Sequence, residues 1–353
     1  MTSTSTQSSA PRGGRRHTAT LITGAGGEVG QSLIRSLHGA GQRDIIAVDI
    51  RELDAELREL CLETFIGDIC DRSLLGRLLA MFEIRAIYHL AALLSTRAEF
   101  TPETAHEVNV GGTLELLRLA AEQARSHGQK VKFVFPSSIA AHGLSDLETK
   151  QSAGAIGEDD YLHPITMYGC NKLYCEHLGR YYARHHRQLA QDRIEQILDF
   201  RCLRFPGLIS AETLPSGGTS DFAPEMIHAA AEGKAYACFV RPDTCIPFLT
   251  MPDAVRAILA LGKGKANSLT QSVYNVRGFS ASAGKLAELV LSHFPDAQID
   301  FVSDTQRQAI VDSWPADVDD TAARRDWGFA PAHDLKQAFD DYLVPQIKAR
   351  YQS

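Results

Sequence analysis

The sequence predicts an α/β fold, in which a doubly wound parallel sheet is followed by a smaller C-terminal region. Short apolar runs alternate with helical patterns over about 140 residues, which is typical of parallel strands joined by helices. A glycine-rich turn separates the first apolar run from the first helical pattern. After residue 204 the composition shifts to segments rich in Gly, Pro and Ser. The chain has 353 residues, of which 44% are hydrophobic, so it can bury one large core with a smaller region attached.

The elements can be placed in order along the chain. An apolar run, the glycine turn and a helical pattern follow one another between residues 18 and 37. The later expected elements are strands at 44–50, 86–95 and 131–143, a helical pattern at 104–126, and mixed helix and strand patterns at 221–233, 272–278 and 283–294. Segment 204–222 has the Gly, Pro and Ser content of a loop that lines a site.

Composition excludes several classes of protein. The formal net charge is −7 and no basic run occurs outside the extreme N-terminus, which argues against a nucleic-acid partner. No apolar run approaches the roughly 18 residues that cross a bilayer, so we expect no membrane partner. The seven cysteines form no CxxC pair and no histidine cluster has metal-ligand spacing. This pattern predicts reduced thiols, no metal and a cytoplasmic location.

The first 16 residues differ from the rest of the chain. Residues 1–16 are rich in Ser and Thr, with three Arg and no acidic side chain. This composition predicts a disordered tail. An organelle presequence is the alternative, because such segments are also rich in Arg and Ser. That alternative would make the location mitochondrial.

The turn at residues 23–30 predicts a dinucleotide site. It reads "TGAGGEVG", with glycines at 24, 27 and 30. Glycine lets the backbone turn tightly and approach a pyrophosphate, and the following helix directs its N-terminus at the phosphates. Asp49 ends the next strand, where a carboxylate binds a ribose 2′-hydroxyl and disfavours NADP. Arg51 weakens this preference for NAD without removing it.

Two further features bear on the domain organisation and on the adenine end of the site. We expect a Rossmann-type NAD-binding domain over 17–204, and a mainly substrate-binding region over 205–353 whose segment near 244–278 returns to the main domain. Asp68 and Ile69 follow another short apolar run, "TFIGDI". Asp68 could face the adenine edge or cap a helix over 71–81, and the sequence leaves both possibilities open.

The stretch "ITMYGCNKLYCE" places Tyr168 and Lys172 four residues apart, on one face of a helix. The spacing suits an ordinary amphipathic helix as well as a tyrosine acid/base with an ammonium partner. The strand before it ends in the pair Ser137 and Ser138, and a hydroxyl at that end of a parallel strand faces the ligand crevice. A free phenol titrates near 10, and a neighbouring ammonium stabilises the phenolate, as a nicotinamide cation would; lowering the pKa by about two to three needs roughly 3–4 kcal/mol.

The motifs from 17 to about 210 resemble the extended short-chain dehydrogenases/reductases. The resemblance is carried, in order, by "TGAGGEVG", "HLAALLS", Asn109, "PSSIAAHG" and "YGCNK". It implies that Ser138, Tyr168 and Lys172 are catalytic, with Ser137 the adjacent competitor, and His142 stands where many members have Tyr. The cofactor residues that it implies are Gly24, Gly27, Glu28, Val29, Gly30, Asp49, Asp68, Ile69, Leu90, Ala91, Ala92, Asn109, Tyr168 and Lys172.

The second half resembles the short-chain type of L-threonine 3-dehydrogenase. The similar stretches are "LDFRCLRFPGLIS", "GGTSDFA", "RPDTCIPFLTMPDAVRA" and "RQAIVDSWPADVDDTAARRDWGF". The resemblance implies NAD-dependent oxidation of the threonine β-hydroxyl to 2-amino-3-ketobutyrate, without a metal. The substrate residues that it implies are Ser95, Ser138, Tyr168, Gly218, Thr219 and Trp314. Ser95 could instead cap a helix, Thr219 could be a turn residue, and Trp314 could belong to the core.

Two alternatives concern the activity. A sugar-nucleotide epimerase or dehydratase would use the same Ser, Tyr and Lys, and a non-catalytic NAD-sensing protein would have lost part of that set.

The resemblance implies a homodimer that pairs through two long helices of the dinucleotide domain. Residues 184–198 are longer than usual for the family, and we expect them to extend the helix that follows Lys172, which could alter the subunit contacts.

Overall fold

The computed structural model describes residues 16–215 and 217–352, so the predicted tail lies outside the described residues except for Arg16. The strands of the main sheet are β1 (His17–Thr23), β2 (Ile45–Asp49), β3 (Glu63–Ile66), β4 (Phe82–His89), β5 (Val131–Ser138), β7 (Leu198–Phe205) and β11 (Val273–Asn275). Their spatial order is β11-β7-β5-β4-β1-β2-β3, and every pairing in this sheet is parallel. The predicted doubly wound parallel sheet is confirmed.

The strand order places a ligand crevice between β1 and β4. From β1 the chain moves outward to β2 and β3, and then returns to the other side of β1 as β4. In sheets of this kind, ligands bind beyond the carboxyl ends of the strands at the point where the order reverses. The residues that follow β1, β2, β4 and β5 therefore converge on one site.

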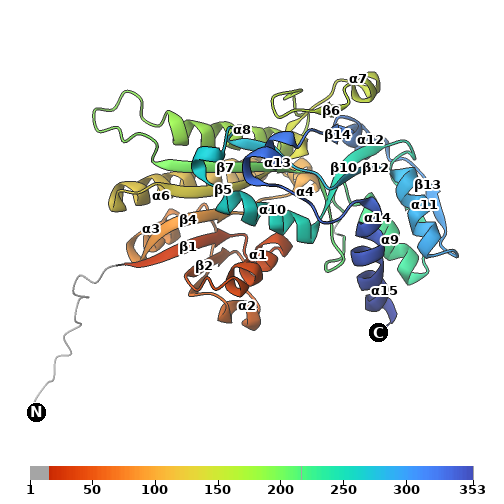
Figure 1. Cartoon of the computed structure of the whole chain (residues 1–353), viewed down its shortest axis with the longest axis horizontal. Helices are drawn as coiled ribbons and strands as arrows, with labels where there is room; N and C mark the ends of the chain where they lie inside the picture. The colour runs from red at the N-terminus through yellow and green to blue at the C-terminus, as the bar shows by residue number, and fades with distance from the viewer. Residues whose placement is uncertain (1–15, 216, 353) are drawn as a thin grey trace, which may run out of the picture.

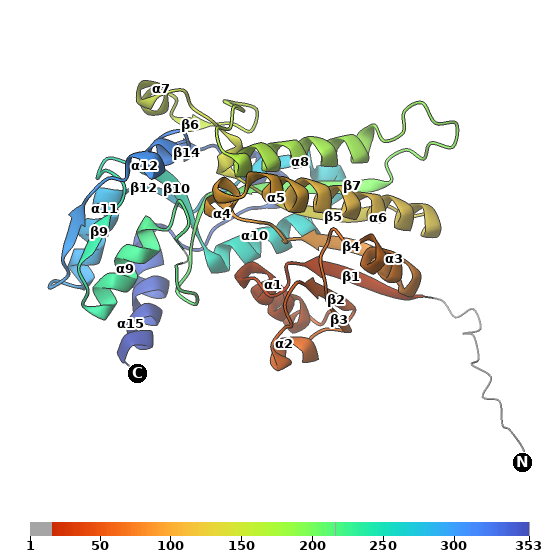
Figure 2. The same ribbon diagram turned by 180° about the vertical axis from the view of Figure 1, so that it is seen from behind.

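Helices cover both faces of the main sheet (Figures 1 and 2). The helices and turns of the first 200 residues are α1 (Glu28–Gly39), α2 (Ala55–Glu59), α3 (Arg72–Met81), α4 (Ser95–Phe100), α5 (Pro102–His106), the π-helical turn η1 (Glu107–Gly111), α6 (Gly112–His127), the 3₁₀ turn η2 (Ile139–Ala141), α7 (Leu147–Ser152) and α8 (Met167–Arg184). One apolar core joins the sheet to α3, α6 and α8, and a second joins its other face to α1 and to α10 (Met251–Lys263).

The C-terminal region packs at the side of the sheet where the crevice opens (Figure 1). Its strands are β8 (Gly207–Ile209), β9 (Tyr236–Cys238), β10 (Cys245–Thr250), β12 (Phe279–Ser282), β13 (Ile299–Phe301) and β14 (Asp317–Val318), with β6 (Ala155–Ile156) paired to β14. Its remaining helices and turns are α9 (Phe222–Glu232), η3 (Ala266–Ser268), α11 (Ala283–His293), α12 (Thr305–Asp312), α13 (Thr321–Trp327), α14 (Leu335–Gln337), the π-helical turn η4 (Ala338–Leu343) and α15 (Val344–Gln352). Since β11 belongs to the main sheet, the two halves of the chain are interwoven, and the domain boundary at 204 stays a prediction.

Three expected elements differ from the structure, and two of the differences mark the site. The run 86–95 is strand only to His89, and the run 131–143 is strand only to Ser138, because the chain leaves the sheet there to line the crevice. The expected helical extension over 184–198 is wrong, since α8 ends at Arg184 and the chain continues as a loop to β7. This loop projects beyond the end of α8 (Figure 1).

Candidate active site

A glycine turn follows β1 and leads into α1. Gly24 has a φ of 68°, and a Cβ there would lie 2.5 Å from the backbone nitrogen of Ala91. A Cβ on Gly30 would lie 2.4 Å from the carbonyl oxygen of Gly24. Both positions therefore require glycine, and the turn directs the start of α1, at Glu28, toward the crevice. The free N–H groups of such a helix end bind anions, so the turn fits the diphosphate of NAD.

The carboxylate of Asp49 lies beside this turn at the end of β2. Its two oxygens accept hydrogen bonds from the backbone N–H groups of Gly26, at 2.9 Å, and Arg51, at 3.0 Å. Each carboxylate oxygen has further lone pairs, which can accept hydrogen bonds from ribose hydroxyls. The two backbone bonds hold Asp49 in the orientation that this role needs.

The structure decides one of the open questions about residues 68–71. Asp71, and not Asp68, is the N-cap of α3, and its side chain accepts the backbone N–H of Ser73. Asp68 is exposed and accepts the N–H of Cys70 at 2.8 Å. The capping role for Asp68 is therefore wrong, and its contact with adenine stays a prediction together with that of Ile69, which is buried.

Asn109 holds the loop that follows β4. Its side-chain oxygen accepts the N–H of Leu93 at 2.8 Å, and its amide nitrogen donates to the Leu93 carbonyl at 3.0 Å. Asn109 lies in the π-helical turn η1, and such turns are frequent at functional sites. At the other end of the loop, Leu90 donates its N–H to the carbonyl of Thr23 at 3.1 Å. The predicted cofactor residues 90–92 are thus fixed beside the glycine turn.

A close approach of α8 to η2 brings Tyr168 to Ser138. A Cβ on Gly169 would lie 2.0 Å from the carbonyl oxygen of Ala140, so only glycine permits this approach. Thr166 caps α8 by accepting the N–H of Gly169 at 3.0 Å, which places Tyr168 in the first helical turn. The Ser138 hydroxyl, at the end of β5, is near enough to the phenol of Tyr168 to lower the pKa of that phenol.

The electrostatics of the site differ from the sequence expectation. Burial raises the pKa of Tyr168 above its usual value, and the nearby Ser138 hydroxyl offsets this only in part. The Lys172 ammonium donates to the carbonyl of Pro136 at 2.8 Å and lies 5.5 Å from the centre of the Tyr168 ring. Burial lowers the pKa of Lys172. Burial is thus the largest influence on the pKa of Tyr168, and the effect of Lys172 on that pKa stays a prediction.

A loop that precedes α9 closes the substrate end of the crevice against α4. Thr219 donates its hydroxyl to that of Ser95 at 3.2 Å, and Thr96 donates to the carbonyl of Gly217 at 3.0 Å. Ser95 is the first residue of α4 and not its cap, so the capping alternative is wrong. Gly218 accepts a bond from Arg307 of α12 at 2.8 Å. The predicted substrate residues of two distant segments are therefore in direct contact.

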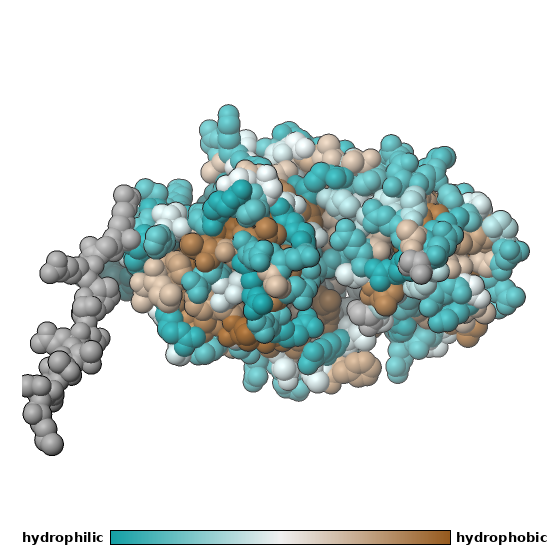
Figure 3. All heavy atoms as spheres, turned by 90° about the horizontal axis from the view of Figure 1, so that it is seen from below, coloured by the Kyte–Doolittle hydropathy of each residue, from teal (hydrophilic) through white to brown (hydrophobic). Residues whose placement is uncertain are grey.

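One cavity of about 710 Å³ joins the two ends of the crevice. The predicted residues that line it are Val29, Leu90, Ala92, Ser95, Ser138, Tyr168, Lys172, Gly218 and Trp314. The other predicted residues are not among those that line it, and they are Gly24, Gly27, Glu28, Gly30, Asp49, Asp68, Ile69, Ala91, Asn109 and Thr219. Figure 3 views the molecule from below, toward the opening between the main sheet and the C-terminal region.

Sequence reasoning missed two charged residues that line the cavity. Arg51, Arg97 and Asp221 all line the cavity, and only Arg51 had been considered. Arg97 is exposed on α4 and Asp221 precedes α9. Asp221 lies within the stretch "GGTSDFA", which could have indicated it, whereas Arg97 follows the stretch "HLAALLS" and lies in none of the motifs. The proximity of α4 to the loop before α9 is a property of the tertiary fold.

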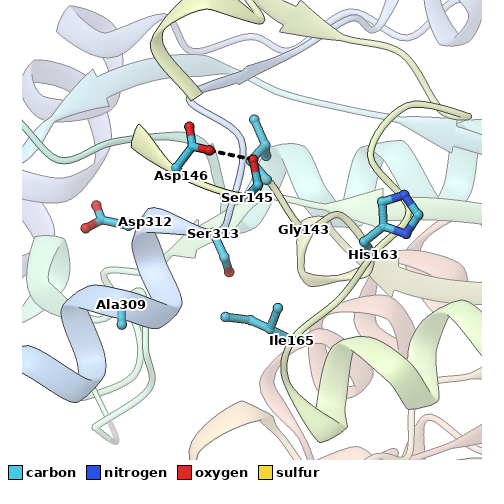
Figure 4. Close-up of a pocket in the computed structure, with 9 residues that line it drawn as sticks. Gly143, Ser145, Asp146, His163, Ile165, Ala309, Asp312 and Ser313 are labelled. Atoms are coloured by element: carbon cyan, nitrogen blue, oxygen red, sulfur yellow. Dashed lines mark hydrogen bonds between the residues drawn. The ribbon is translucent and has the colours of Figure 1, made fainter. Parts of the chain in front are cut away.

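A second cavity of about 550 Å³ lies apart from the three predicted catalytic residues. Figure 4 shows its walls, which come from the segment after η2, the segment before α8, and α12. The carboxylate of Asp312 points away from the other labelled side chains and pairs with Arg241. Ser313 lines this cavity and the next residue, Trp314, lines the first, so one segment contributes to both walls.

Within residues 16–215 and 217–352, no group of three or more His, Cys, Asp or Glu side chains could hold a metal ion. Over the same residues, none of the helices is long and apolar enough to cross a membrane.

Comparisons with known proteins agree with this geometry. The profile of the NAD dependent epimerase/dehydratase family matches residues 20–276. The "L-threonine 3-dehydrogenase, mitochondrial" of Bos taurus is 35% identical over 318 residues, which are 90% of this chain and 79% of the relative.

Solved structures of two relatives are similar over almost the whole chain. The holo form of "GalE-like L-Threonine dehydrogenase from Cupriavidus necator" has 32% identity and a TM-score of 0.79, covering 94% of this chain and 99% of the relative. Its apo form has a TM-score of 0.69 and 29% identity over the same shares. A "Monomeric L-threonine 3-dehydrogenase from metagenome database" has 33% identity and a TM-score of 0.80, with coverage of 94% and 99%.

Proposed function

The chain belongs to the NAD dependent epimerase/dehydratase family, and on that premise we propose that it oxidises the β-hydroxyl of L-threonine to 2-amino-3-ketobutyrate. The expected extended short-chain family, the enzyme class and NAD as cofactor are confirmed by the family match and by the relatives. One observation carries the proposal. Ser138, Tyr168 and Lys172 line the same cavity as Ser95, Gly218 and Trp314.

The residues present fit NAD at one end of this cavity. Gly24 lets the loop at Ala91 approach the turn closely, the N-terminus of α1 follows the turn without a side-chain cap, and the Asp49 carboxylate bonds to the N–H of Gly26. When bound, NAD supplies a nicotinamide ring that accepts a hydride. The ammonium of Lys172 keeps two N–H donors beyond its bond to Pro136, and these suit a ribose hydroxyl.

The proton chemistry belongs to Tyr168 and Ser138. Tyr168, as phenolate, takes the proton of the substrate hydroxyl, and Ser138 hydrogen-bonds to the oxygen as it becomes a carbonyl. Ser138 and Tyr168 line the same cavity, so a substrate oxygen that contacts both side chains has a short path for its proton. The buried strand ends around these groups exclude water from the proton transfer.

The charges of the cavity favour an amino acid over a sugar nucleotide. At the substrate end the lining carries Arg97 and Asp221, one charge of each sign, which matches the zwitterion of an amino acid. A sugar nucleotide carries two phosphates and would need more than one cation there. We assign the α-carboxylate to Arg97, which protrudes from α4 next to Ser95 and Thr96.

The test is an assay with purified protein. L-threonine and NAD should give the absorbance of reduced cofactor, whereas a UDP-sugar should give none. Serine and allothreonine define the preference among β-hydroxy amino acids, and NADP should be used more slowly because of Asp49. Absence of activity with every amino acid, together with tightly held NAD and turnover of a UDP-sugar, would favour the epimerase or dehydratase. Binding of NAD without any turnover would favour the non-catalytic sensor.

Two further proposals concern assembly and location. We propose a homodimer, since Tyr174 and Tyr181 are exposed on one face of α8 and Phe100 of α4 is 81% exposed. Light scattering of the purified chain decides this, and a relative named as monomeric makes a single subunit the contrary outcome. We propose a cytoplasmic location. Mitochondrial import of a fluorescent fusion that requires residues 1–16 would establish the alternative, which the name of the bovine relative supports.

A further inference from the structure

Glu28 forms a link between the glycine turn and the C-terminal region. It is the first residue of α1, and its carboxylate accepts hydrogen bonds from the hydroxyls of Ser210 and Thr213. The Thr213 bond is 2.5 Å long. These partners lie more than 180 residues along the chain from Glu28, at the start of the loop that leads to α9. One side chain of the cofactor turn therefore touches the region that forms the substrate end.

The loop that Glu28 holds forms a wall of the active-site cavity. Ser210 also accepts the N–H of Glu212 at 3.0 Å, and Ala211 donates its N–H to the phenol oxygen of Tyr342 at 3.1 Å. The loop is thereby fixed at its first residues. Its last residues, 218–221, contact α4 and line the cavity. Between these two attachments Leu214 is 58% exposed.

The charge of Glu28 is unexpected at this place. The first turn of a diphosphate-binding helix offers its N–H groups and its positive dipole end to the phosphates, and a carboxylate there repels them. The hydroxyls of Ser210 and Thr213 hold the carboxylate toward the C-terminal region. A carboxylate that only stabilised the helix dipole would need no such partners.

We propose that Glu28 is a positioning residue that couples the cofactor turn to the substrate wall formed by residues 210–215 and 217–221. It holds the wall in place for the amino acid, and its charge weakens the binding of the diphosphate. The inference rests on the proposed function for its substrate, but its effects on the loop and on NAD affinity do not depend on which substrate is used. It predicts opposite changes in affinity for the two ligands when Glu28 is replaced.

The test compares Glu28→Ala and Glu28→Gln with the wild-type chain. Glu28→Ala should raise the KM for L-threonine at least about fivefold, with a smaller change in kcat, because the wall loses its anchor. Glu28→Gln keeps an acceptor oxygen and should restore the KM to within about twofold of the wild type. Both variants should bind NAD about threefold more tightly in a fluorescence titration, because the like charge is gone.

Cleavage by a Glu-specific endoproteinase after the exposed Glu212, followed by mass spectrometry, reports on the wall without any substrate. The initial cleavage rate should rise at least about threefold in Glu28→Ala and less in Glu28→Gln. Ser280→Ala is the matched control, since it removes a hydroxyl–carboxylate bond to Asp317 that lies outside the cavity, and it should change none of the three readouts.

The inference would be overturned by an unchanged cleavage rate in Glu28→Ala. It would also be overturned if both variants bound NAD as tightly as the wild type or more weakly. If the wild-type chain does not oxidise L-threonine, the proposed function fails, while cleavage and NAD affinity still decide the role of Glu28. If the wild type is active and Glu28→Ala leaves the KM unchanged, the coupling fails and the proposed function stands.

Discussion

Two buried histidines make the fold sensitive to acid. His89, at the end of β4, lies between the hydroxyls of Thr23 and Thr113, at 2.9 Å from each. The Thr113 hydroxyl donates to the carbonyl of Asn109, so it accepts from His89 Nε2, and His89 Nδ1 accepts from Thr23. The neutral imidazole therefore fits its surroundings and leaves no place for a second proton. Burial, with a smaller effect from Lys172, lowers the pKa of His89 to about 3.

His142, which follows η2, is the second buried histidine, and its surroundings also fit a neutral imidazole. Its Nδ1 lies 2.8 Å from the carbonyl oxygen of Asp160, and its Nε2 lies 3.2 Å from the guanidinium of Arg204. Burial, helped by Arg204, lowers its pKa to about 4. Arg204 in turn forms a fully buried ion pair with Glu176 of α8, so the positive charge beside His142 is fixed.

The sign and size of the effect follow from these pKa values. The pKa of each histidine is lower in the folded chain than in the unfolded chain, where it is near 6.5. As the pH falls, the unfolded state therefore takes up protons first. Their contribution to stability is complete above pH 6.5 and is lost below it. Between about pH 7.5 and about pH 5, each should cost about 2 kcal/mol of the free energy of unfolding, about 4 kcal/mol together.

Equilibrium urea unfolding of the full chain at several pH values in this window measures the loss. His89→Gln removes one titrating group and should reduce the loss by about half, whatever it does to stability at neutral pH. The reasoning is refuted if the wild type and His89→Gln lose the same free energy between the two pH values. A total loss below about 1 kcal/mol would refute it as well, because neither histidine could then be strongly perturbed.

Other predictions test the site directly. Tyr168→Phe should lower kcat at least about a hundredfold with little change in NAD affinity. Tyr174→Phe, on the exposed face of α8, is the control. Full activity in Tyr168→Phe would exclude the mechanism. Gly24→Ala should weaken NAD binding at least about tenfold in a titration, because the φ of 68° and the close contact with the next loop leave no room for a Cβ. Arg97→Gln should raise the KM for L-threonine about tenfold but leave that for threoninol, which lacks the carboxylate, unchanged; equal effects on both would remove Arg97 from carboxylate binding.

Much of the fold could be predicted because its signals are local. Alternation of apolar runs and helical patterns specifies strands and crossovers, and the handedness of such units leaves few arrangements of the sheet. The expected strands at 44–50 and 131–143 therefore correspond to β2 and β5. The predicted strand at 131–143 extends beyond Ser138, where β5 ends, because Ile139 and its neighbours are as apolar as strand residues. Only the contact of η2 with Gly169 shows that they have left the sheet.

The candidate site was predictable to the extent that it consists of short motifs. The turn at 23–30 and the Tyr168–Lys172 pair are read from spacing, and the structure brings both to one crevice. The link from Glu28 to Ser210 and the position of Arg97 against the loop before α9 depend on contacts between segments far apart in sequence. Lys172 lines the cavity, but its bond to the Pro136 carbonyl depends on where β5 ends, and its spacing from Tyr168 does not show that bond.

The raised pKa of Tyr168 implies that the base is not ready in the protein alone. Its phenol is buried, the nearby Ser138 hydroxyl offsets burial only in part, and the Lys172 ammonium is held by the backbone of β5. The cationic nicotinamide of NAD would add a positive charge near the phenol when the cofactor is bound, and we expect this charge to favour the phenolate.

A titration of tyrosinate absorbance can test this implication, with Tyr168→Phe subtracted to isolate one phenol among ten tyrosines. The pKa of Tyr168 should lie above the usual value near 10 in the free protein, and should fall when NAD is added. Since the base form is then favoured only in the complex, L-threonine should bind productively after NAD, and kcat should rise with pH until the phenol is fully ionised. A pKa that is already low in the free protein would mean that Lys172 acts on the phenol after all, and that the order of binding is free.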